Sequence, residues 1–136
     1  MEIRVCIDVP EMDAALRFYV EGLGLTAGRR FDPKWAELLG ASAPIDLLVK
    51  EEASPPFAGA AEQRDYRRHW TPTHLDFVVP DIEAAVKRAE AFGGRFEREV
   101  LGQAYGRLAL MSDPFGNGFC FLEFKGKGYD EIKALP

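Results

Sequence analysis

Three side chains that can bind a divalent metal ion or take part in acid–base chemistry interrupt apolar stretches of this sequence. Asp46 is the only carboxylate in the run PIDLLVK, His74 stands directly before a largely apolar stretch, and Cys120 lies between two phenylalanines. Imidazole nitrogen, carboxylate oxygen and thiolate sulfur are the donors that zinc-like ions accept. Each residue also has a plain structural interpretation: a polar group satisfied by a hydrogen bond, or a cysteine buried as a small apolar side chain.

The motifs of several large enzyme classes are absent. The sequence contains no Ser-His-Asp pattern, no P-loop and no dinucleotide-binding fingerprint. Gly22-Leu23-Gly24 follows a helical pattern rather than a strand, so these glycines do not meet the requirements of a nucleotide-binding turn. Triad hydrolysis and nucleotide-dependent chemistry are therefore not indicated.

Length and composition fit one compact globular domain. The chain has 136 residues, of which 47% are hydrophobic and 29% charged, and these values are ordinary for a soluble protein. The formal net charge of -5 argues against a nucleic-acid partner, and no apolar run approaches the roughly 20 residues of a membrane-spanning helix. The two cysteines lie in strand patterns and the N-terminus lacks the layout of a signal peptide. We therefore expect no disulfide framework and a cytoplasmic location.

An internal repeat positions the candidate residues. Residues 3–19 and 73–89 each read as a strand followed at once by an amphipathic helix, and the segments VPEMDAA and VPDIEAA align within them. This alignment places His74 on Arg4. Because an internal repeat determines the whole fold, we interpret the chain as two copies of one unit, with the functional residues facing the space between them.

Each copy has the pattern strand, helix and then three strands. In the first strand, Val5, Ile7 and Val9 share one face and Arg4 lies on the other, as expected from the alternation of side chains along a strand. The first unit covers residues 1–51 and the second covers 73–125. The predicted helices cover 11–22 and 81–92, and the predicted strands cover 2–9, 25–31, 35–39, 45–50, 73–79, 95–100, 107–112 and 119–124.

Residues 52–72 separate the two units. The beginning of this segment is rich in Pro and Ala, which is typical of a linker. We expect it to be mobile and to act as a lid, with Tyr66, His69 and Trp70 able to reach the rim of a binding site. The tail, residues 126–136, is expected to contain one helical turn.

Taken together, these features resemble a known superfamily. A helix reading AALRFYVEGLGL, the internal repeat and a final hairpin reading SDPFGNGFCFLEF are similar to the vicinal oxygen chelate superfamily, which contains glyoxalases, bleomycin-resistance proteins and extradiol dioxygenases. The resemblance implies an α+β fold in which two βαβββ repeats, with eight strands and two main helices, form a curved mixed-sheet cup. A fold of this kind supports many reactions, so the resemblance does not specify one.

The enzymes of that superfamily hold one divalent metal ion in the cup, and the resemblance implies its ligand positions here, which are Arg4, Asp46, His74 and Cys120. A guanidinium stays protonated and has no lone pair to donate, and a fixed cation repels a divalent ion. We therefore expect no metal and no other cofactor, and an ion pair between Arg4 and Asp46 where the metal would lie, with His74 nearby. Glu123 is not a substitute ligand, because alternation places it on the opposite face of its strand from Cys120.

Several further residues are weaker candidates. Trp35 and Tyr105 are candidates for the wall of the cup, although aromatic residues fill cores more often than they line sites. Arg67 and Arg68 in the linker are interpreted as a solvated charge pair.

Two functional classes follow. The first is a metal-free protein that binds a small organic molecule in its cup, as the bleomycin-resistance members of the superfamily do. The alternative is a metal-dependent lyase, isomerase or dioxygenase that uses His74 and Asp46, so whether the chain is an enzyme stays open. In a purely structural role, His74 would hydrogen-bond to Asp76 or Tyr105. The superfamily commonly completes each cup by pairing units between chains, so the resemblance implies a homodimer.

Overall fold

The computed structural model describes residues 1–134, and the side chains of residues 100–102 lie outside that description, as do residues 135–136 of the expected tail. None of the helices in the described part is long and apolar enough to cross a lipid bilayer. The elements in chain order are β1 Val5–Val9, α1 Met12–Leu16, a π-helical continuation Arg17–Gly22, β2 Thr26–Asp32, β3 Trp35–Leu39, β4 Ile45–Val49, β5 Leu75–Val78, α2 Ile82–Ala91, β6 Arg95–Gln103, β7 Gly106–Ser112, β8 Gly118–Phe124 and a 3-10 turn Gly128–Glu131.

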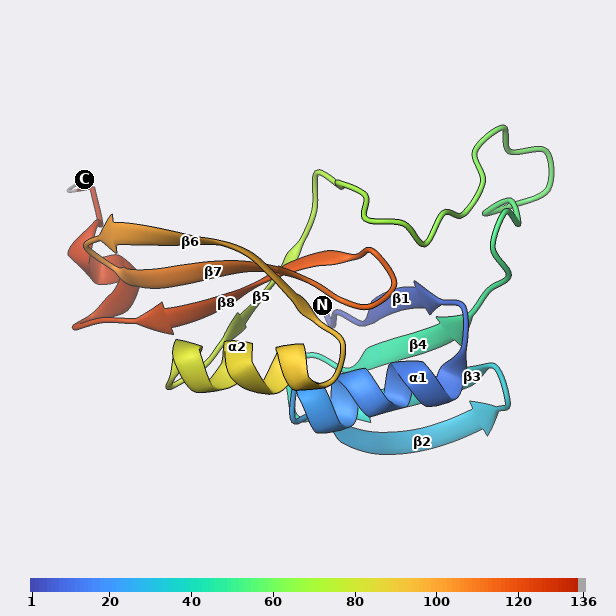
Figure 1. Cartoon of the computed structure of the whole chain (residues 1–136), viewed down its shortest axis with the longest axis horizontal. Helices are drawn as coiled ribbons and strands as arrows, with labels where there is room; N and C mark the ends of the chain where they lie inside the picture. Colours follow the sequence, from blue (N-terminus) through green and yellow to red (C-terminus); the bar gives the residue numbers. More distant parts are fainter. Residues whose placement is uncertain (135–136) are drawn as a thin grey trace.

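Within the described residues, the eight strands form two four-stranded sheets with the same connectivity (Figure 1). The strand order is β1-β4-β3-β2 in the first sheet and β5-β8-β7-β6 in the second. In both sheets the first strand runs parallel to the last strand of its unit, and the other neighbours are antiparallel. The predicted α+β fold and its internal repeat are confirmed.

Acidic side chains fix where both helices begin. The Glu11 carboxylate accepts hydrogen bonds from the backbone N–H groups of Asp13 and Ala14 at the start of α1. At the start of α2, the predicted cap Asp81 accepts from the Ala84 N–H at 2.9 Å. Such caps satisfy amide groups that have no partner within the helix.

Glu123 also lies at the start of α2. Its Oε2 atom accepts a hydrogen bond of 2.6 Å from the backbone N–H of Ile82. Glu123 therefore faces the helix and not the open side of the sheet, as the strand alternation predicted.

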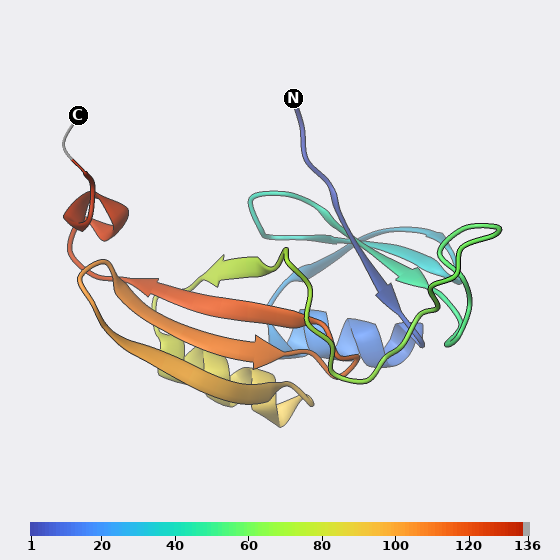
Figure 2. The same ribbon diagram turned by 90° about the horizontal axis from the view of Figure 1, so that it is seen from above.

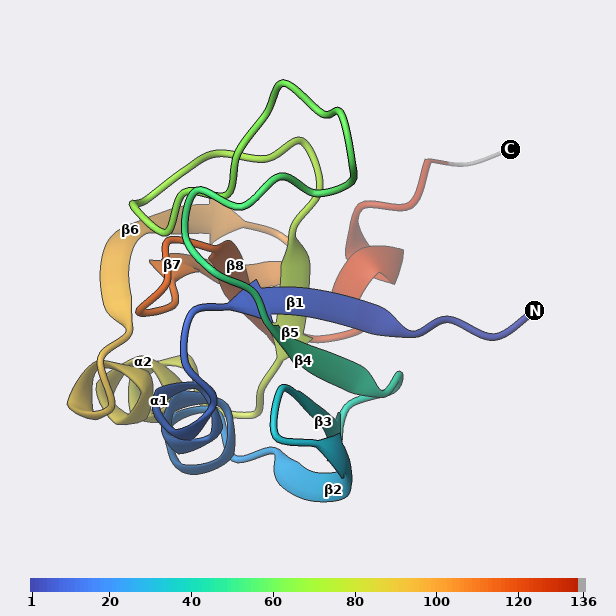
Figure 3. The same cartoon turned by 90° about the vertical axis from the view of Figure 1, so that its right-hand side faces the viewer.

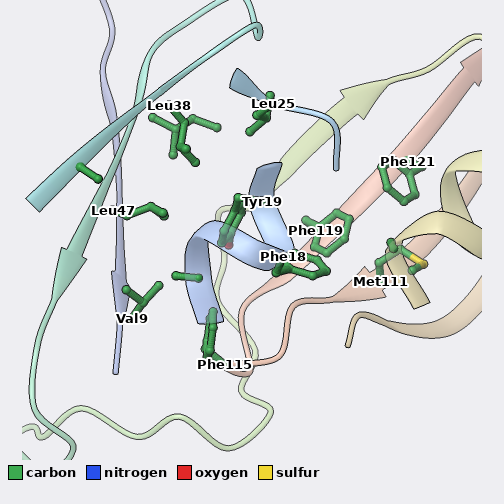
Figure 4. Packing of buried hydrophobic residues seen from close by; sticks show 14 of the residues in the cluster. Val9, Phe18, Tyr19, Leu25, Leu38, Leu47, Met111, Phe115, Phe119 and Phe121 are labelled. Carbon is green, nitrogen blue, oxygen red and sulfur yellow. The ribbon is translucent and has the colours of Figure 1, made fainter. Parts of the chain in front are cut away.

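Both helices lie on the same side of the two sheets, and they meet where the units join (Figures 1 and 3). Glycines allow this close approach: a Cβ atom added at Gly22 would lie 3.1 Å from the Cβ of Phe92, and one added at Gly94 would lie 2.9 Å from the Phe18 ring. A continuous hydrophobic core joins the units (Figure 4). Its labelled members are Val9, Phe18, Tyr19, Leu25, Leu38, Leu47, Met111, Phe115, Phe119 and Phe121.

A buried hydrogen bond also joins the two units. The Tyr19 hydroxyl donates to Asp113 Oδ2 at 2.6 Å, linking the first helix to the β7–β8 turn. Asp113 also accepts from the backbone N–H groups of Phe115 and Asn117 and from the side-chain amide of Asn117. Burial, followed by the neighbouring Asp113 carboxylate, raises the pKa of Tyr19 well above its usual value. Tyr19 therefore stays protonated and acts as a donor.

The linker contains no helix or strand and is attached at several points along its course (Figure 2). Arg64 Nε donates to Asp8 Oδ2 at 2.6 Å, and the Tyr66 hydroxyl donates to the Lys50 carbonyl oxygen at 2.8 Å. Arg67 and Arg68 are both exposed, and Arg68 also has a partner that the sequence did not predict. Its guanidinium forms an ion pair with Glu97 of β6, because the linker passes directly beside the second sheet.

We predict that Tyr19→Phe lowers the free energy of unfolding by about 1–2 kcal/mol, because the substitution removes one buried hydrogen bond to a carboxylate. Urea unfolding measured by circular dichroism provides the test. Tyr129→Phe is the matched control, since the Tyr129 side chain is exposed and exposed changes usually stay within about 0.5 kcal/mol. An equal loss for both variants would contradict the role of the Tyr19 bond.

Candidate functional site

An ion pair lies on the helix-free face of the first sheet. Arg4 contacts Asp46 through two hydrogen bonds, Nε to Oδ2 at 2.9 Å and Nη2 to Oδ1 at 2.8 Å. Trp35 Nε1 donates to the same Oδ1 atom at 3.1 Å. Two parallel N–H···O bonds are the strongest arrangement for this kind of pair. The expected Arg4–Asp46 ion pair is therefore present.

The pair belongs to a larger charge network that the sequence reasoning missed. Arg4 Nη2 also donates to Glu37 Oε2 at 2.8 Å. Arg29 binds the same carboxylate, through Nε to Oε1 at 2.9 Å and Nη2 to Oε2 at 2.7 Å. Glu37 is the direct partner of Asp46 in the β3–β4 register. Strand alternation singles out Glu37 as the one charged residue in the run WAELL, but its position opposite Asp46 depends on the register between the strands.

The negatively charged side chains of this network are buried, and the positively charged ones are exposed. The side chains of Glu37 and Asp46 are each 4% exposed, whereas those of Arg4 and Arg29 are 41% and 68% exposed. Hydrogen bonds from Arg29 and then Arg4 lower the pKa of Glu37 to about 2. The hydrogen bond from Arg4 is the main cause that lowers the pKa of Asp46, against the opposing effect of burial. All four groups are charged at neutral pH, and the cations face the solvent.

Two aromatic rings border the charged groups. The rings of Phe31 and Trp35 lie with their centroids 4.4 Å apart, and Arg29 Cζ lies 5.2 Å from the centroid of the Phe31 ring. Both aromatic side chains remain partly exposed. Trp35, a candidate for the cup wall, therefore lies beside Asp46 on the open face of the first sheet.

A second cluster lies on the open face of the second sheet. His74 Nε2 is 3.1 Å from Asp76 Oδ1, and Asp76 pairs with Cys120 in the β5–β8 register. One donor atom from each of these three residues lies within 4.8 Å of the others. The structural role considered for His74, a contact with Asp76, is present. Asp76 as a site residue was missed, although it shares a strand face with His74.

The Cys120 thiol is protonated in this arrangement. Burial, followed by the charge of Asp76 and a hydrogen bond with it, raises the pKa of Cys120 to about 12. Because the thiolate is the form that binds metals, an ion at this cluster would have to displace the thiol proton.

A pocket of about 300 Å³ opens beside the second cluster, between the second sheet and the linker. Its lining is mainly apolar and includes the charged residues Arg68 and Glu97. The lining residues are Arg68, Trp70, Thr71, His74, Glu97, Leu108, Leu110, Met111, Gly118, Phe119 and Cys120. Trp70 therefore lies at this pocket, whereas the lid role of the linker stays a prediction. Tyr66 instead packs against the core.

Tyr105 lies elsewhere. It belongs to the β6–β7 turn, where its ring centroid is 5.3 Å from that of Tyr129, which in turn contacts Phe124. It is not among the described residues that line the pocket beside His74. The reason is that the hairpin extends past the cluster and ends against the 3-10 turn of the tail (Figure 1).

Comparison with known proteins places the chain in a family. Residues 4–122 match the family model of the glyoxalase-like domain, so the chain belongs to this family. It is 34% identical over 116 residues to the anthracycline biosynthesis protein DnrV of Streptomyces peucetius, a match that covers 78% of this chain and 39% of DnrV. It is also 34% identical over 93 residues to the anthracycline biosynthesis protein DauV of Streptomyces sp. (strain C5), covering 61% and 33% of the two chains. The chain thus spans well under half the length of these relatives.

Solved structures share the same fold. The fosfomycin resistance protein FosX of Listeria monocytogenes superposes with a TM-score of 0.72 at 14% identity, covering 98% of each chain. A lactoylglutathione lyase of Agrobacterium tumefaciens superposes with a TM-score of 0.64 at 18% identity, and the match covers 92% of this chain and 98% of the lyase. The resemblance to the glyoxalase, bleomycin-resistance and dioxygenase superfamily is confirmed at the level of fold.

The metal implied by that superfamily does not fit the first sheet. The resemblance implies four ligand positions, which are expected to be Arg4, Asp46, His74 and Cys120. Arg4 cannot coordinate an ion, and it already occupies both oxygens of Asp46. The donors that gather within the described residues are His74, Asp76 and Cys120, and this set of nitrogen, oxygen and sulfur atoms does fit zinc.

We predict that Arg4→Met lowers the free energy of unfolding at pH 7. In this variant the free energy of unfolding should also decrease less as the pH falls from about 5 to about 2. Carboxyl groups with lowered folded-state pKa values stabilise the fold above their unfolded pKa of about 4, and this contribution is lost as the pH falls towards 2. Without Arg4, the pKa of Asp46 rises, so less stability remains to be lost between about pH 5 and pH 2.

The measurement is the urea midpoint at several pH values. Arg30→Met serves as the control, because Arg30 donates only to the backbone oxygens of Asp32 and Pro33 among the described residues. The same pH profile in both variants would show that Arg4 has no special role.

Proposed function

We propose that this chain binds a small organic molecule at the open faces of its sheets, without a metal ion at the position of Arg4. The observation that carries this proposal is the two-bond contact of Arg4 with Asp46. This contact puts a fixed cation at a position where the superfamily's enzymes use a metal ligand. A cation with exposed N–H groups is suited to binding polar or anionic ligand atoms.

The pocket beside the second sheet supports the same proposal. Its volume of about 300 Å³ lies at the lower end of the range for small-molecule sites, and such sites combine an apolar lining with a few polar groups. Leu108, Leu110 and Phe119 supply the apolar part, while His74 and Glu97 supply polar atoms. The names of DnrV and DauV refer to anthracycline biosynthesis, which favours an organic ligand. Nucleic acid is not an expected partner, and the cytoplasmic location stays a prediction.

Leu110→Trp tests the pocket. Filling it should weaken binding of small aromatic compounds at least tenfold, a change of about 1.4 kcal/mol. Binding is followed by amide chemical-shift changes in the labelled protein, which should cluster around the pocket. Ile132→Trp, at an exposed position in the tail, is the control. Weak shifts scattered over the surface and unchanged by Leu110→Trp would refute the proposal.

We further propose a homodimer. Large apolar side chains remain exposed on the open faces of both sheets, including Leu39, Val78 and Phe124, and exposed apolar surface of this kind marks interaction sites. A second copy would cover these side chains and complete the cup.

Light scattering at micromolar concentration should therefore give twice the chain mass of 15.2 kDa. Val78→Asp should shift the protein towards the monomer, because it places a charge within the covered surface, while Ile132→Asp should not. A single-chain mass for the unmodified protein would count against the dimer.

A second candidate function is supported by the cluster on the second sheet. A metal-dependent lyase, isomerase or dioxygenase would hold its ion through His74, Asp76 and Cys120, which lie close together. Asp46, the carboxylate expected from the sequence to join His74, is instead held by Arg4 and Trp35.

Equilibrium dialysis of untagged protein against zinc separates the two functions. The metal-dependent candidate requires one zinc per chain, with affinity that increases with pH because the Cys120 proton must leave. Asp76→Asn should then lower the affinity at least tenfold, whereas Asp46→Asn should not. No stoichiometric zinc binding would eliminate this candidate and leave the metal-free one.

A further inference from the structure

We infer that the open face of the first sheet selects a planar aromatic ligand that carries an anionic group, bound by Arg4, Arg29, Phe31 and Trp35. These four residues are called the arginine–aromatic face below. The inference rests on the proposed small-molecule function and adds the chemical class of the ligand.

The direction of the charges is the first reason. The carboxylates of Glu37 and Asp46 are almost fully buried behind the guanidinium groups of Arg4 and Arg29, which are 41% and 68% exposed. Although two positive and two negative charges cancel in number, a molecule approaching this face meets the cations first. A carboxylate, phenolate or sulfonate is therefore attracted, and a cationic ligand is repelled.

Free donors are the second reason. Both arginines use Nε and Nη2 to hold the carboxylates. In the part of the chain that the structure describes, the Nη1 groups of Arg4 and Arg29 donate no hydrogen bond. Each guanidinium thus keeps N–H groups for a ligand, and hydrogen bonds from an ionised donor to an anionic oxygen are among the strong ones.

The two cations are also held close together. The Nη2 atoms of Arg4 and Arg29 bind one oxygen atom, Glu37 Oε2, at 2.8 and 2.7 Å. Like charges at this separation repel each other, and an anion that contacts both guanidinium groups would relieve that repulsion. Because the buried carboxylates already fix both side chains, binding such an anion requires little loss of side-chain freedom.

The aromatic rings supply the remaining contact. Phe31 and Trp35 lie beside the guanidinium groups and keep part of their surface exposed. A flat ring packs on such a surface in offset or edge-to-face geometry. An aromatic ring and an acidic group on one ligand can therefore contact the rings and the cations at the same time.

Titration calorimetry with three probes tests the inference. The probes are 1-naphthoate, the neutral 1-naphthamide and the non-aromatic anion cyclohexanecarboxylate. We expect 1-naphthoate to bind at least tenfold more tightly than either of the others, as the loss of one charged hydrogen bond or of ring packing would cause.

The variants locate the effect. Arg29→Gln should reduce the affinity for 1-naphthoate at least tenfold and leave 1-naphthamide almost unaffected, and it leaves Glu37 bound by Arg4. Arg30→Gln removes the same charge from the same strand but should have little effect, because Arg30 is turned to the backbone of Asp32 and Pro33. Phe31→Leu should weaken the binding of 1-naphthoate more than the binding of cyclohexanecarboxylate.

The outcomes distinguish the inference from the function on which it rests. Equal binding of 1-naphthoate and 1-naphthamide, or equal effects of Arg29→Gln and Arg30→Gln, overturns the anionic class while leaving a small-molecule site in place. An Arg29-dependent anion effect without any difference between naphthoate and cyclohexanecarboxylate overturns the aromatic part. Failure of every probe to bind, charged or neutral, overturns the proposed function together with the inference.

Discussion

Each sheet of this protein buries one face against the helices and leaves the other open, and this constraint determines where the polar residues of the candidate site lie. Side chains alternate between the two faces of a strand. The apolar positions of β1, β4, β5 and β8 enter the shared core, so the polar positions between them lie on the open side, with the exception of Glu123 at the start of α2. Two groups of chemically capable side chains arise in this way, one on each sheet, without any need for a dedicated loop.

The two groups differ in what they offer to a ligand. In the first sheet, Arg4 and Arg29 donate hydrogen bonds to the carboxylates of Glu37 and Asp46. The carboxylates therefore hold the arginine side chains in place, and the guanidinium groups are the part of this network that faces the solvent. In the second sheet, His74, Asp76 and Cys120 pair among themselves. His74 and Asp76 are exposed, whereas Cys120 is buried. One fold unit has thus been repeated with different chemistry in each copy.

The sequence was sufficient to predict the fold, because alternation and the repeat assign faces to residues within a strand. The same rule placed Glu123 towards the helix. The Arg4–Asp46 pair was predicted from the ligand positions that the family resemblance implies, together with the fixed charge of Arg4. Glu37 and Asp76 were missed because their roles depend on which residues of neighbouring strands stand opposite each other, and the register is set by pairing between strands. The ion pair of Arg68 with Glu97 was not predicted for a related reason: the path of an irregular linker depends on tertiary contacts rather than on local pattern.

The turn between β7 and β8 is fastened on two sides. Tyr19 of the first unit binds Asp113 at one end of the turn, and the linker residue His69 donates its backbone N–H to the Gly116 carbonyl oxygen. Gly116 has a φ of +85°, and a Cβ atom there would collide with the Arg67 carbonyl oxygen, so the linker backbone rests directly on the turn. The turn therefore contacts the first unit and also the linker segment that contains Arg68 and Trp70, two residues that line the pocket. The same turn thus holds the two units together and fixes the linker backbone beside the pocket residues Arg68 and Trp70.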